Sequence, residues 1–370
     1  MESGISGSTH PIGQINAGVA HQWRIKMEKW NNRERVMAAL SGQEPDRVPY
    51  CELNIDRVFA AKLLGWDEKP YVNALDEDTP FTLEEAKKVS TTLGLDNIFY
   101  LRRQPVYVNT FVDEEGRIFP GTGKIKTQSD LAMIDLPDPH RDEFYAEAES
   151  FARQKGEYAA FFLTRGGLAP AMLSMGIDHF CLSLYDDLKL VEQLLDIYFG
   201  WMEVVAEKVC QLDFDVFCMA DDFAFNTGLM FSPDTFKQLI VPHYRRIAEK
   251  ITIPWVFHSD GNIQKSIDML IAVGVAGIHP IEKGAMDIRK VKKDYGDKLC
   301  IFGNVDLVLL GSGSPEEVEK EVLELIRDIA PGGGYILTSG NSLADYLKPE
   351  CVLAISKTIA KYGSYPIKID

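Results

Sequence analysis

The sequence predicts an α/β protein whose strands and helices form one closed (β/α)8 TIM barrel. Apolar, strand-like runs alternate with segments of helical period through most of the 370 residues, and about eight such runs occur. No GxGxxG follows the first run, which argues against the dinucleotide-binding open sheet that shows the same alternation. The strand count and the missing glycine motif therefore favour the barrel.

Local signals place the first elements. An N-terminal helical arm, residues 1–30, precedes a single barrel domain, residues 31–370. Asn31 or Asn32 is the expected N-cap of the first helix, and Pro49 opens the first strand, YCELNI.

A β-hairpin insertion is expected between the early barrel strands. Residues 97–128 alternate apolar and polar side chains around the turn DEEG, a pattern typical of antiparallel pairing. The later barrel strands are expected in YAAFFLTRGG, FDVFCMADD, PWVFHSDGN, AGIHPIEKG, LCIFGNVD and GYILTSGN, with helical segments between them.

Composition limits the class of partner. A formal net charge of -16 does not favour nucleic acid or an anionic membrane surface, because both require clustered Lys and Arg. The six cysteines are scattered without a CxxC pair, and no run reaches the roughly 18 apolar residues of a membrane span. We expect a cytoplasmic protein that acts on a small molecule. The oligomeric state stays open.

Polar side chains end most of the predicted strands, although buried parallel strands are usually apolar throughout. Carboxyl ends of barrel strands meet at one mouth, where active sites of this fold lie, so a shared pocket is expected. The residues are Arg165, Asp221, Asp222, His258, Asp260, Glu282, Asn304, Asp306 and Asn341.

The stretch WVFHSDGN carries the strongest candidates. His258 and Asp260 are two residues apart and share one face of an extended strand. Glu282 on the next strand can complete a metal site of one imidazole and two carboxylates, or one of the three can serve as a general acid. Strand alternation sends only one of Asp221 and Asp222 toward this pocket.

Other polar residues have structural readings. Asn262, Asn304 and Asp306 are equally consistent with helix caps and turns. His243 is expected on the surface of a helix that also carries two arginines. His279 alternates away from Glu282, which favours a structural role.

The chain from about Asn31 onward resembles the uroporphyrinogen decarboxylase superfamily. The segments that carry the resemblance are NNRERVMAALSGQEPDRVPY, HSDGN, IHPIEK, YGDKLCIFGNVD, GSPEEV and GGGYILTSGNSL, in this order. The resemblance implies a (β/α)8 barrel. It also implies one of two activities: decarboxylation of uroporphyrinogen, or methyl transfer to or from a corrinoid protein.

Two segments favour the methyltransferase branch. The decarboxylases carry an arginine-rich RQAGR motif after the first strand, where this chain has YCELNIDRVF with only Arg57. A substrate with eight carboxylates needs several guanidinium partners, and a chain of net charge -16 repels it further. RERVMAALSGQEPDRVP is similar to the start of the methyltransferases.

Within that branch, thiol methyltransferases bind zinc through His-x-Cys and a later Cys. His258 matches the His, but Asp260 and Asn341 stand where the two cysteines are expected. Without thiolates the site is a poor match to zinc that activates a thiol. The resemblance therefore implies an O-demethylase methyltransferase, which passes a methyl group from a small methoxylated, aromatic donor to cobalamin on a separate corrinoid protein.

In this hypothesis the catalytic residues are His258, Asp260, Glu282 and Asp222, and the first three hold zinc. The substrate-binding residues are Arg165, for a donor carboxylate, and Phe223, Phe225, Asn341 and Tyr346. A uroporphyrinogen decarboxylase is the alternative enzyme. A corrinoid-binding protein without catalysis is the non-enzymatic alternative.

Overall fold

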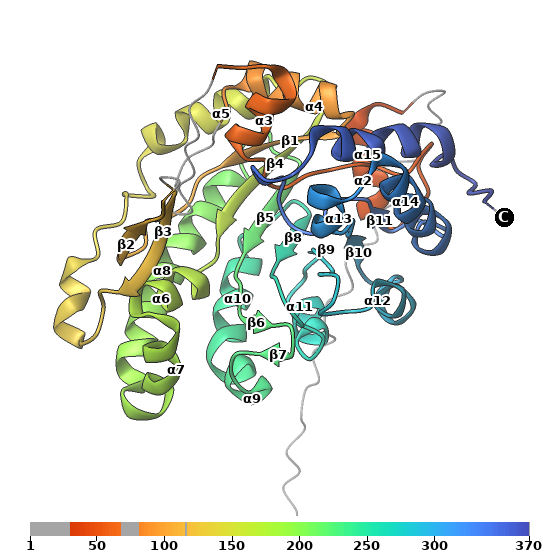
Figure 1. Cartoon of the computed structure of the whole chain (residues 1–370). Coiled ribbons are helices and arrows are strands. Elements are labelled where there is room, and N and C mark those ends of the chain that lie inside the picture. Colours follow the sequence, from red (N-terminus) through yellow and green to blue (C-terminus); the bar gives the residue numbers. More distant parts are fainter. Residues whose placement is uncertain (1–29, 68–80, 115–116, 370) are drawn as a thin grey trace, which may run out of the picture.

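The computed structural model describes residues 30–67, 81–114 and 117–369, and these contain a curled sheet of seven parallel strands (Figure 1). The expected N-terminal arm lies outside the described residues except for Trp30. The strands, in their order in the sheet, are β1 (Asn97–Leu101), β4 (Ala159–Arg165), β5 (Val216–Ala220), β8 (Trp255–His258), β9 (Gly277–His279), β10 (Cys300–Phe302) and β11 (Tyr335–Ile336). The last six lie in the runs expected for the later barrel strands, and β1 forms the start of residues 97–128, ahead of the inserted hairpin.

An eighth extended segment, residues 49–55, closes the sheet into a barrel. On one side Leu337 N–H donates to Pro49 O at 2.9 Å, and Cys51 N–H donates to Leu337 O at 3.1 Å. On the other side Asp96 N–H donates to Tyr50 O at 2.7 Å. Residues 49–55 therefore lie between β11 and β1, and the predicted (β/α)8 TIM barrel is confirmed.

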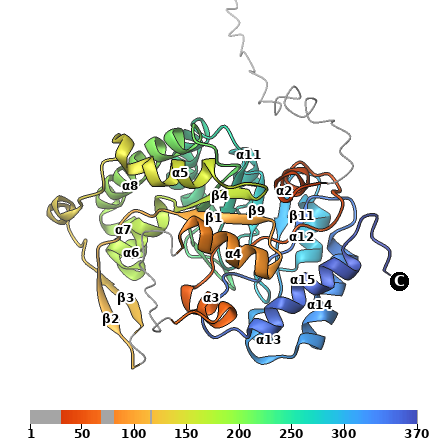
Figure 2. The ribbon, with the colours of Figure 1, turned by 90° about the horizontal axis from the view of Figure 1, so that it is seen from above.

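Helices cover the outside of the barrel (Figures 1 and 2). No helix among the described residues is both long and apolar enough to span a bilayer. The helices of the described residues are α2 (Asn32–Leu40), α3 (Arg57–Leu64), α4 (Leu83–Leu93), α5 (Ala146–Arg153), α6 (Leu168–Met175), α7 (Ile177–Asp186), α8 (Leu188–Val209), α9 (Pro233–Thr235), α10 (Val241–Ala248), α11 (Ile267–Ala272), α12 (Ile288–Tyr295), α13 (Leu307–Ser312), α14 (Pro315–Ile329) and α15 (Pro349–Tyr362). Two 3-10 turns, Gln128–Met133 and Asp142–Tyr145, and a π-helical turn, Phe236–Ile240, complete the set.

Sequence signals explain where helices begin. Asn31 caps α2 in a reciprocal capping box with Glu34, both hydrogen bonds being 2.9 Å long. Ser314 and Glu317 form the same box at α14, whose first residue is Pro315. Along α14 the buried positions recur at helical spacing, so one apolar face packs toward the barrel and α15.

The predicted hairpin insertion is confirmed. Strands β2 (Val108–Val112) and β3 (Ile118–Gly123) pair antiparallel and project from the side of the barrel (Figure 2). A second, two-residue hairpin, β6 (Ala224–Phe225) with β7 (Gly228–Leu229), follows β5 and lies beside the candidate site.

A buried carboxylate holds α2 and the closing segment together. Asp96 has no solvent exposure and accepts from Arg35 Nη1 at 2.6 Å and from Arg47 Nη2 at 2.9 Å. It also accepts from the backbone N–H of Tyr50 at 2.9 Å. The carboxylate therefore links α2, the segment after it and the first residue of the closing strand.

We predict that Asp96→Ala lowers the free energy of unfolding by about 3–5 kcal/mol, because it leaves two guanidinium groups without their buried partner. Chemical denaturation measures this loss. Glu149→Ala, which removes an exposed ion pair with Arg153 (2.5 Å), is the control and changes stability by about 0–1 kcal/mol. Equal effects of the two substitutions would contradict the role assigned to Asp96.

Candidate metal centre at the barrel mouth

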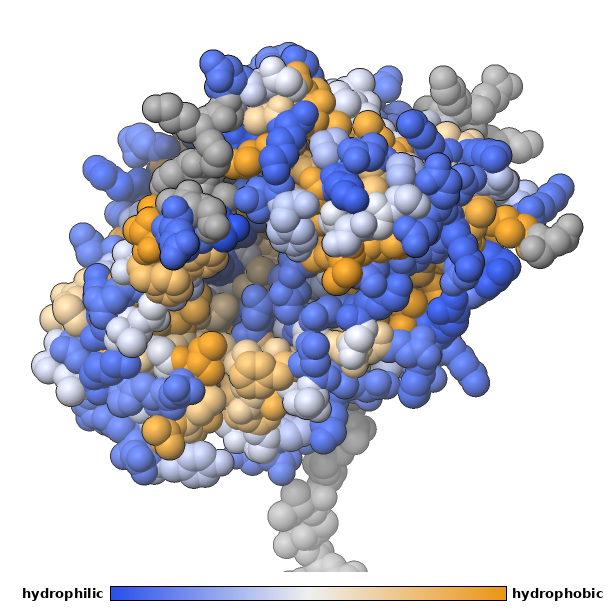
Figure 3. Space-filling model, in the orientation of Figure 1, coloured by the Kyte–Doolittle hydropathy of each residue, from blue (hydrophilic) through white to orange (hydrophobic). Residues whose placement is uncertain are grey.

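Cross-strand register lines up the last residues of four neighbouring strands, and three of these four residues are polar. Arg165 is the partner of Ala220, Ala220 of His258, and His258 of His279. Partners in a parallel sheet point to the same face, so these side chains lie in one row around the mouth. The space-filling view shows a hollow on this face, with hydrophobic residues gathered below it (Figure 3).

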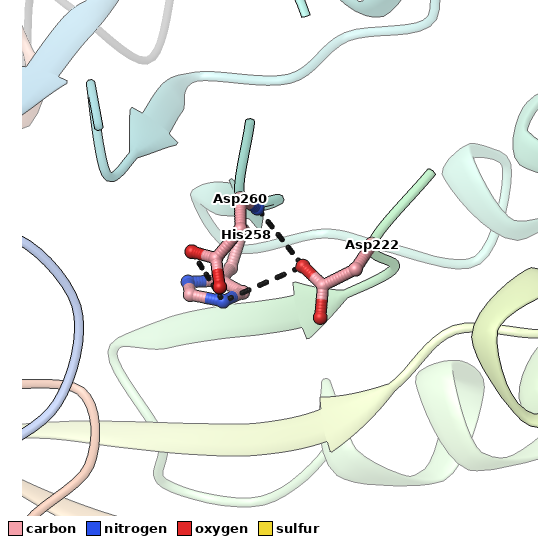
Figure 4. A group of neighbouring side chains, drawn as sticks. All are labelled: Asp222, His258 and Asp260. Carbon is pink, nitrogen blue, oxygen red and sulfur yellow. Dashed lines mark hydrogen bonds and ion pairs between the residues drawn. The ribbon is translucent and has the colours of Figure 1, made fainter. Parts of the chain in front are cut away.

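Asp222, His258 and Asp260 point toward one another at this mouth (Figure 4). His258 Nε2 lies 3.7 Å from Asp222 Oδ1 and 3.8 Å from Asp260 Oδ1. The backbone N–H of Asp260 donates to Asp222 Oδ1 at 2.9 Å, which fixes the two aspartates relative to each other. One ligand atom from each residue lies within 4.8 Å of the other two.

The donor set fits a divalent cation. The two distances from His258 Nε2 are too long for hydrogen bonds, and Asp260 Oδ1 is buried with no hydrogen-bond partner among the described residues. Ligand atoms ~2.0–2.1 Å from a tetrahedral ion lie ~3.4 Å apart, so a small inward movement brings these atoms to coordination distance. Burial raises the pKa of Asp260, and the carboxylates of Asp222 and Glu282 add to this effect while His258 opposes it. A cation would relieve this repulsion.

The neighbours of Asp260 orient the group. Asn341 Nδ2 donates to Asp260 Oδ2 at 2.7 Å, which leaves Oδ1 facing His258. Glu282 Oε2 accepts from the backbone N–H of Gly261 at 2.6 Å and thereby holds the turn after Asp260. Gly261 has φ +80°, and a Cβ there would lie 2.5 Å from Ala224 O, so the turn in HSDGN requires glycine.

Asp222 takes the place beside His258 that the sequence analysis gave to Glu282. Among the described residues, the group of potential ligands contains Asp222 and does not contain Glu282. The two carboxylates after β5 diverge, as strand alternation predicts. Asp221 is fully buried and accepts from Ala169 N–H at 2.7 Å and from the hydroxyl of Tyr244 at 2.9 Å, so it caps α6.

Two predicted placements are wrong. His243 is buried, not on the surface, and stacks on Phe199 with 4.4 Å between ring centroids. The π-helical turn before it adds one residue to the helix and rotates the following side chains toward α8. Phe223 has no exposed surface and packs on Phe236 and Phe257, because alternation directs it away from the mouth that Asp222 faces. It therefore cannot line a substrate pocket here.

The remaining candidates divide into structural and accessible residues. The cap and turn readings of two residues are confirmed: Asp306 caps α13, and Asn262 accepts from the backbone N–H two residues on. Buried Asn304 forms neither a cap nor a turn, because its Nδ2 donates to the backbone carbonyl of Ile281. Phe225 and Tyr346 have more than half of their surface exposed, and Arg165 is nearly buried, with Nη1 donating to Gln104 O at 3.3 Å.

The contact between His258 and His279 was not predicted from the sequence. Their Nδ1 atoms lie 2.7 Å apart, and their rings stack with 5.0 Å between centroids. Each histidine is the last residue of its strand, and β8 and β9 are neighbours. Two strand ends that follow one another along a barrel sequence are the signal that could have predicted this pair.

Comparison with known proteins identifies the family of the chain. A model of the uroporphyrinogen decarboxylase (URO-D) family matches residues 111–362. The chain belongs to this family. A solved structure, a methyltransferase from Methanosarcina mazei, has a TM-score of 0.69 and 20% sequence identity, and the match covers 90% of this chain and 99% of that one. This likeness confirms the barrel fold.

The curated relatives are of two kinds. A uroporphyrinogen decarboxylase from Alkalilimnicola ehrlichii is 22% identical over 348 residues, which cover 86% of this chain and 90% of the relative. Methylcobamide:CoM methyltransferase MtaA from Methanosarcina barkeri is 26% identical over 167 residues, which cover 45% of this chain and 47% of the relative. The second match thus spans about half of each protein.

The buried carboxyl group of Asp221 is expected to make the stability of the folded chain depend on pH. Burial raises its pKa to about 7 from 3.8, so between these values the folded chain holds a proton that the unfolded chain releases. Stability from this group is therefore present below pH ~4 and is lost, by up to about 4 kcal/mol, as pH rises through ~7. Urea denaturation at several pH values measures the slope.

Asp221→Asn is the matched variant, because an amide oxygen still accepts from Ala169 N–H while the titration is gone. We expect the part of the slope between pH ~4 and ~7 to flatten in this variant. An unchanged slope would show that other groups cause the dependence.

Proposed function

We propose that this chain is the methyltransferase component of a corrinoid-dependent O-demethylase. It removes a methyl group from a small methoxylated aromatic donor and passes it to the cob(I)alamin of a separate corrinoid protein. The observation that carries the proposal is the thiol-free group of Asp222, His258 and Asp260 at the barrel mouth. The methyltransferase relative MtaA, whose name includes a methylcobamide, supports transfer chemistry on a corrinoid.

The donor atom is oxygen in this proposal because the site offers hard ligands. Two carboxylates and one imidazole suit a metal that binds oxygen, whereas thiol activation usually employs thiolate ligands. Among ethers, aryl methyl ethers have the better leaving group, because the pKa of a phenol, ~10, lies several units below that of an aliphatic alcohol. At about 1.4 kcal/mol per unit, this difference makes the aryl ether the easier substrate.

His258, Asp222 and Asp260 would hold a divalent ion such as zinc. When bound, the ion supplies Lewis acidity that stabilises charge on the departing oxygen. The chain's own residues prepare the site. Asn341 orients the carboxylate of Asp260, and Glu282 fixes the turn that carries it. Cobalt must reach the methyl carbon, so the corrinoid protein would approach this mouth.

The row along the mouth supports a donor with an anionic substituent. Arg165 and His258 are separated only by Ala220, the one residue of β5 that is not fully buried. Neighbouring strands are ~4.8 Å apart, so the backbones of Arg165 and His258 are separated by ~10 Å, about the length of a substituted aromatic ring. Arg165 would pair with a carboxylate while the methoxy group lies near His258. Phe225 and Tyr346 are accessible for contacts with the ring.

The second candidate, uroporphyrinogen decarboxylation, is favoured by the long match to the Alkalilimnicola enzyme. The segment after the closing strand weighs against it. Arg57 is the arginine available there, and its guanidinium binds Glu85 at 2.9 Å and lies over the ring of Trp66. A polyanionic substrate would have to compete with this carboxylate.

The function is tested by mixing the protein with chemically reduced cobalamin and a panel of methoxylated aromatics, and following the visible change from cob(I)alamin to methylcobalamin. We expect donor-dependent conversion that a chelator abolishes. His258→Ala should lower the rate by about 10²–10⁴-fold without unfolding the protein. Conversion of uroporphyrinogen to coproporphyrinogen without added metal would instead establish the decarboxylase. Tight corrinoid binding without turnover of any donor would indicate a binding protein.

A substrate pair tests Arg165. Arg165→Met should raise KM for a methoxybenzoate by about 10–100-fold, since a hydrogen bond to a charged group contributes about 1.5–3 kcal/mol. KM for the matching methoxybenzyl alcohol should stay within about threefold. An equal increase for both donors would contradict the proposed carboxylate contact.

A further inference from the structure

His279 lies fully buried beside His258, and the only hydrogen bond of its side chain among the described residues joins the two Nδ1 atoms at 2.7 Å. Its other ring nitrogen, Nε2, is buried and has no hydrogen-bond partner among the described residues. The ring packs edge-on against Phe302, with 6.3 Å between centroids. The polar contact of the His279 side chain with the candidate site is therefore made through Nδ1 alone, beside the stacking of the two rings.

In a hydrogen bond between two Nδ1 atoms, one ring carries the proton on its Nδ1 and donates, and the Nδ1 lone pair of the other ring accepts. If His279 donates, neutral His258 carries its own proton on Nε2, the atom that faces Asp222 and Asp260. An N–H cannot bind a metal ion. If His258 donates, its Nε2 lone pair faces the two carboxylates and is available as a ligand.

We propose that His279 is the positioning residue of the metal centre: it accepts the Nδ1–H of His258 and thereby turns the Nε2 lone pair of His258 toward Asp222 and Asp260. This inference rests on the metal site of the proposed function. The partner of a metal-binding histidine is most often a carboxylate, a backbone carbonyl or water. Here a second imidazole takes that position.

The cost of burying a histidine supports this role. With its proton on Nε2, His279 keeps a buried donor unpaired, which is unfavourable for folding. A leucine or phenylalanine would fill the same space against Phe302 without that cost. Histidine is advantageous at this position because its Nδ1 forms a hydrogen bond with His258, which neither apolar residue could form.

Metal affinity tests the proposal without any donor or corrinoid. Zinc binding is measured at pH 7 by competition with a chromogenic chelator. We expect H279L to weaken binding about 10–100-fold, the range for loss of such a partner. H279N, whose Oδ1 can accept from His258 Nδ1–H, should remain within a few-fold of the wild type. H243L removes a buried histidine that contacts Phe199 and Arg246 rather than the site, and should not change zinc affinity.

Unchanged affinity in H279L would overturn the role of His279 and leave the proposed function intact. A wild-type chain that binds no zinc, cobalt(II) or manganese(II) would overturn the metal centre itself. If H279L does not fold, as judged by circular dichroism, ¹⁵N NMR of the zinc-loaded wild type decides. The proposal requires His258 to carry its proton on Nδ1, and a proton on Nε2 would overturn it.

Discussion

Parallel pairing around a closed barrel is the constraint on which the site depends. The segment 49–55 joins β11 to β1, so every strand ends at the same mouth. The register then determines which side chains meet. Ala220 lies beside His258 and His258 beside His279, so the imidazole of His258 has a small neighbour on one side and a hydrogen-bond partner on the other. A shift of one residue would turn these side chains to the opposite face.

Two acidic residues with little exposure, Asp96 and Asp260, have different surroundings. Asp96 is surrounded by two arginines and a backbone N–H, which offset part of the effect of burial on its pKa, and its carboxylate links three segments of the fold. Asp260 instead lies near the carboxylates of Asp222 and Glu282, and one of its oxygens has no hydrogen-bond partner among the described residues. His258 is the nearby group that can carry a positive charge. Such a concentration of negative charge is unfavourable for the folded chain alone. It becomes favourable when a cation binds, which is why this cluster, and not the Asp96 network, is the functional candidate.

More of the fold than of the candidate site could be predicted from the sequence. Strand positions, the inserted hairpin and an N-cap at Asn31, one of the two residues expected there, follow from local patterns, and all agree with the structure. The residues that share the mouth could be predicted because barrel strands end together. Which of them touch could not, since Glu282 turns toward the backbone of Gly261 while Asp222 approaches His258. Loop geometry after the strands decides this, and it leaves no periodic signal.

Helix irregularity and long-range packing account for the other differences. His243 is buried because a π-helical turn changes the phase of its helix, and no residue pattern in the segment indicates that turn. The contact of His279 with His258 joins residues on separate strands. The effect of this contact on the metal centre depends on which ring nitrogen of His258 carries the proton, and the spacing of residues in the sequence does not indicate this.

The most direct test of a thiol-free metal centre is X-ray absorption at the zinc edge of the zinc-loaded protein. We expect a first shell of oxygen and nitrogen at ~2.0–2.2 Å, including one imidazole, and no sulfur. A zinc–sulfur distance near ~2.3 Å would contradict it, because zinc would then be bound by cysteine and not by Asp222, His258 and Asp260.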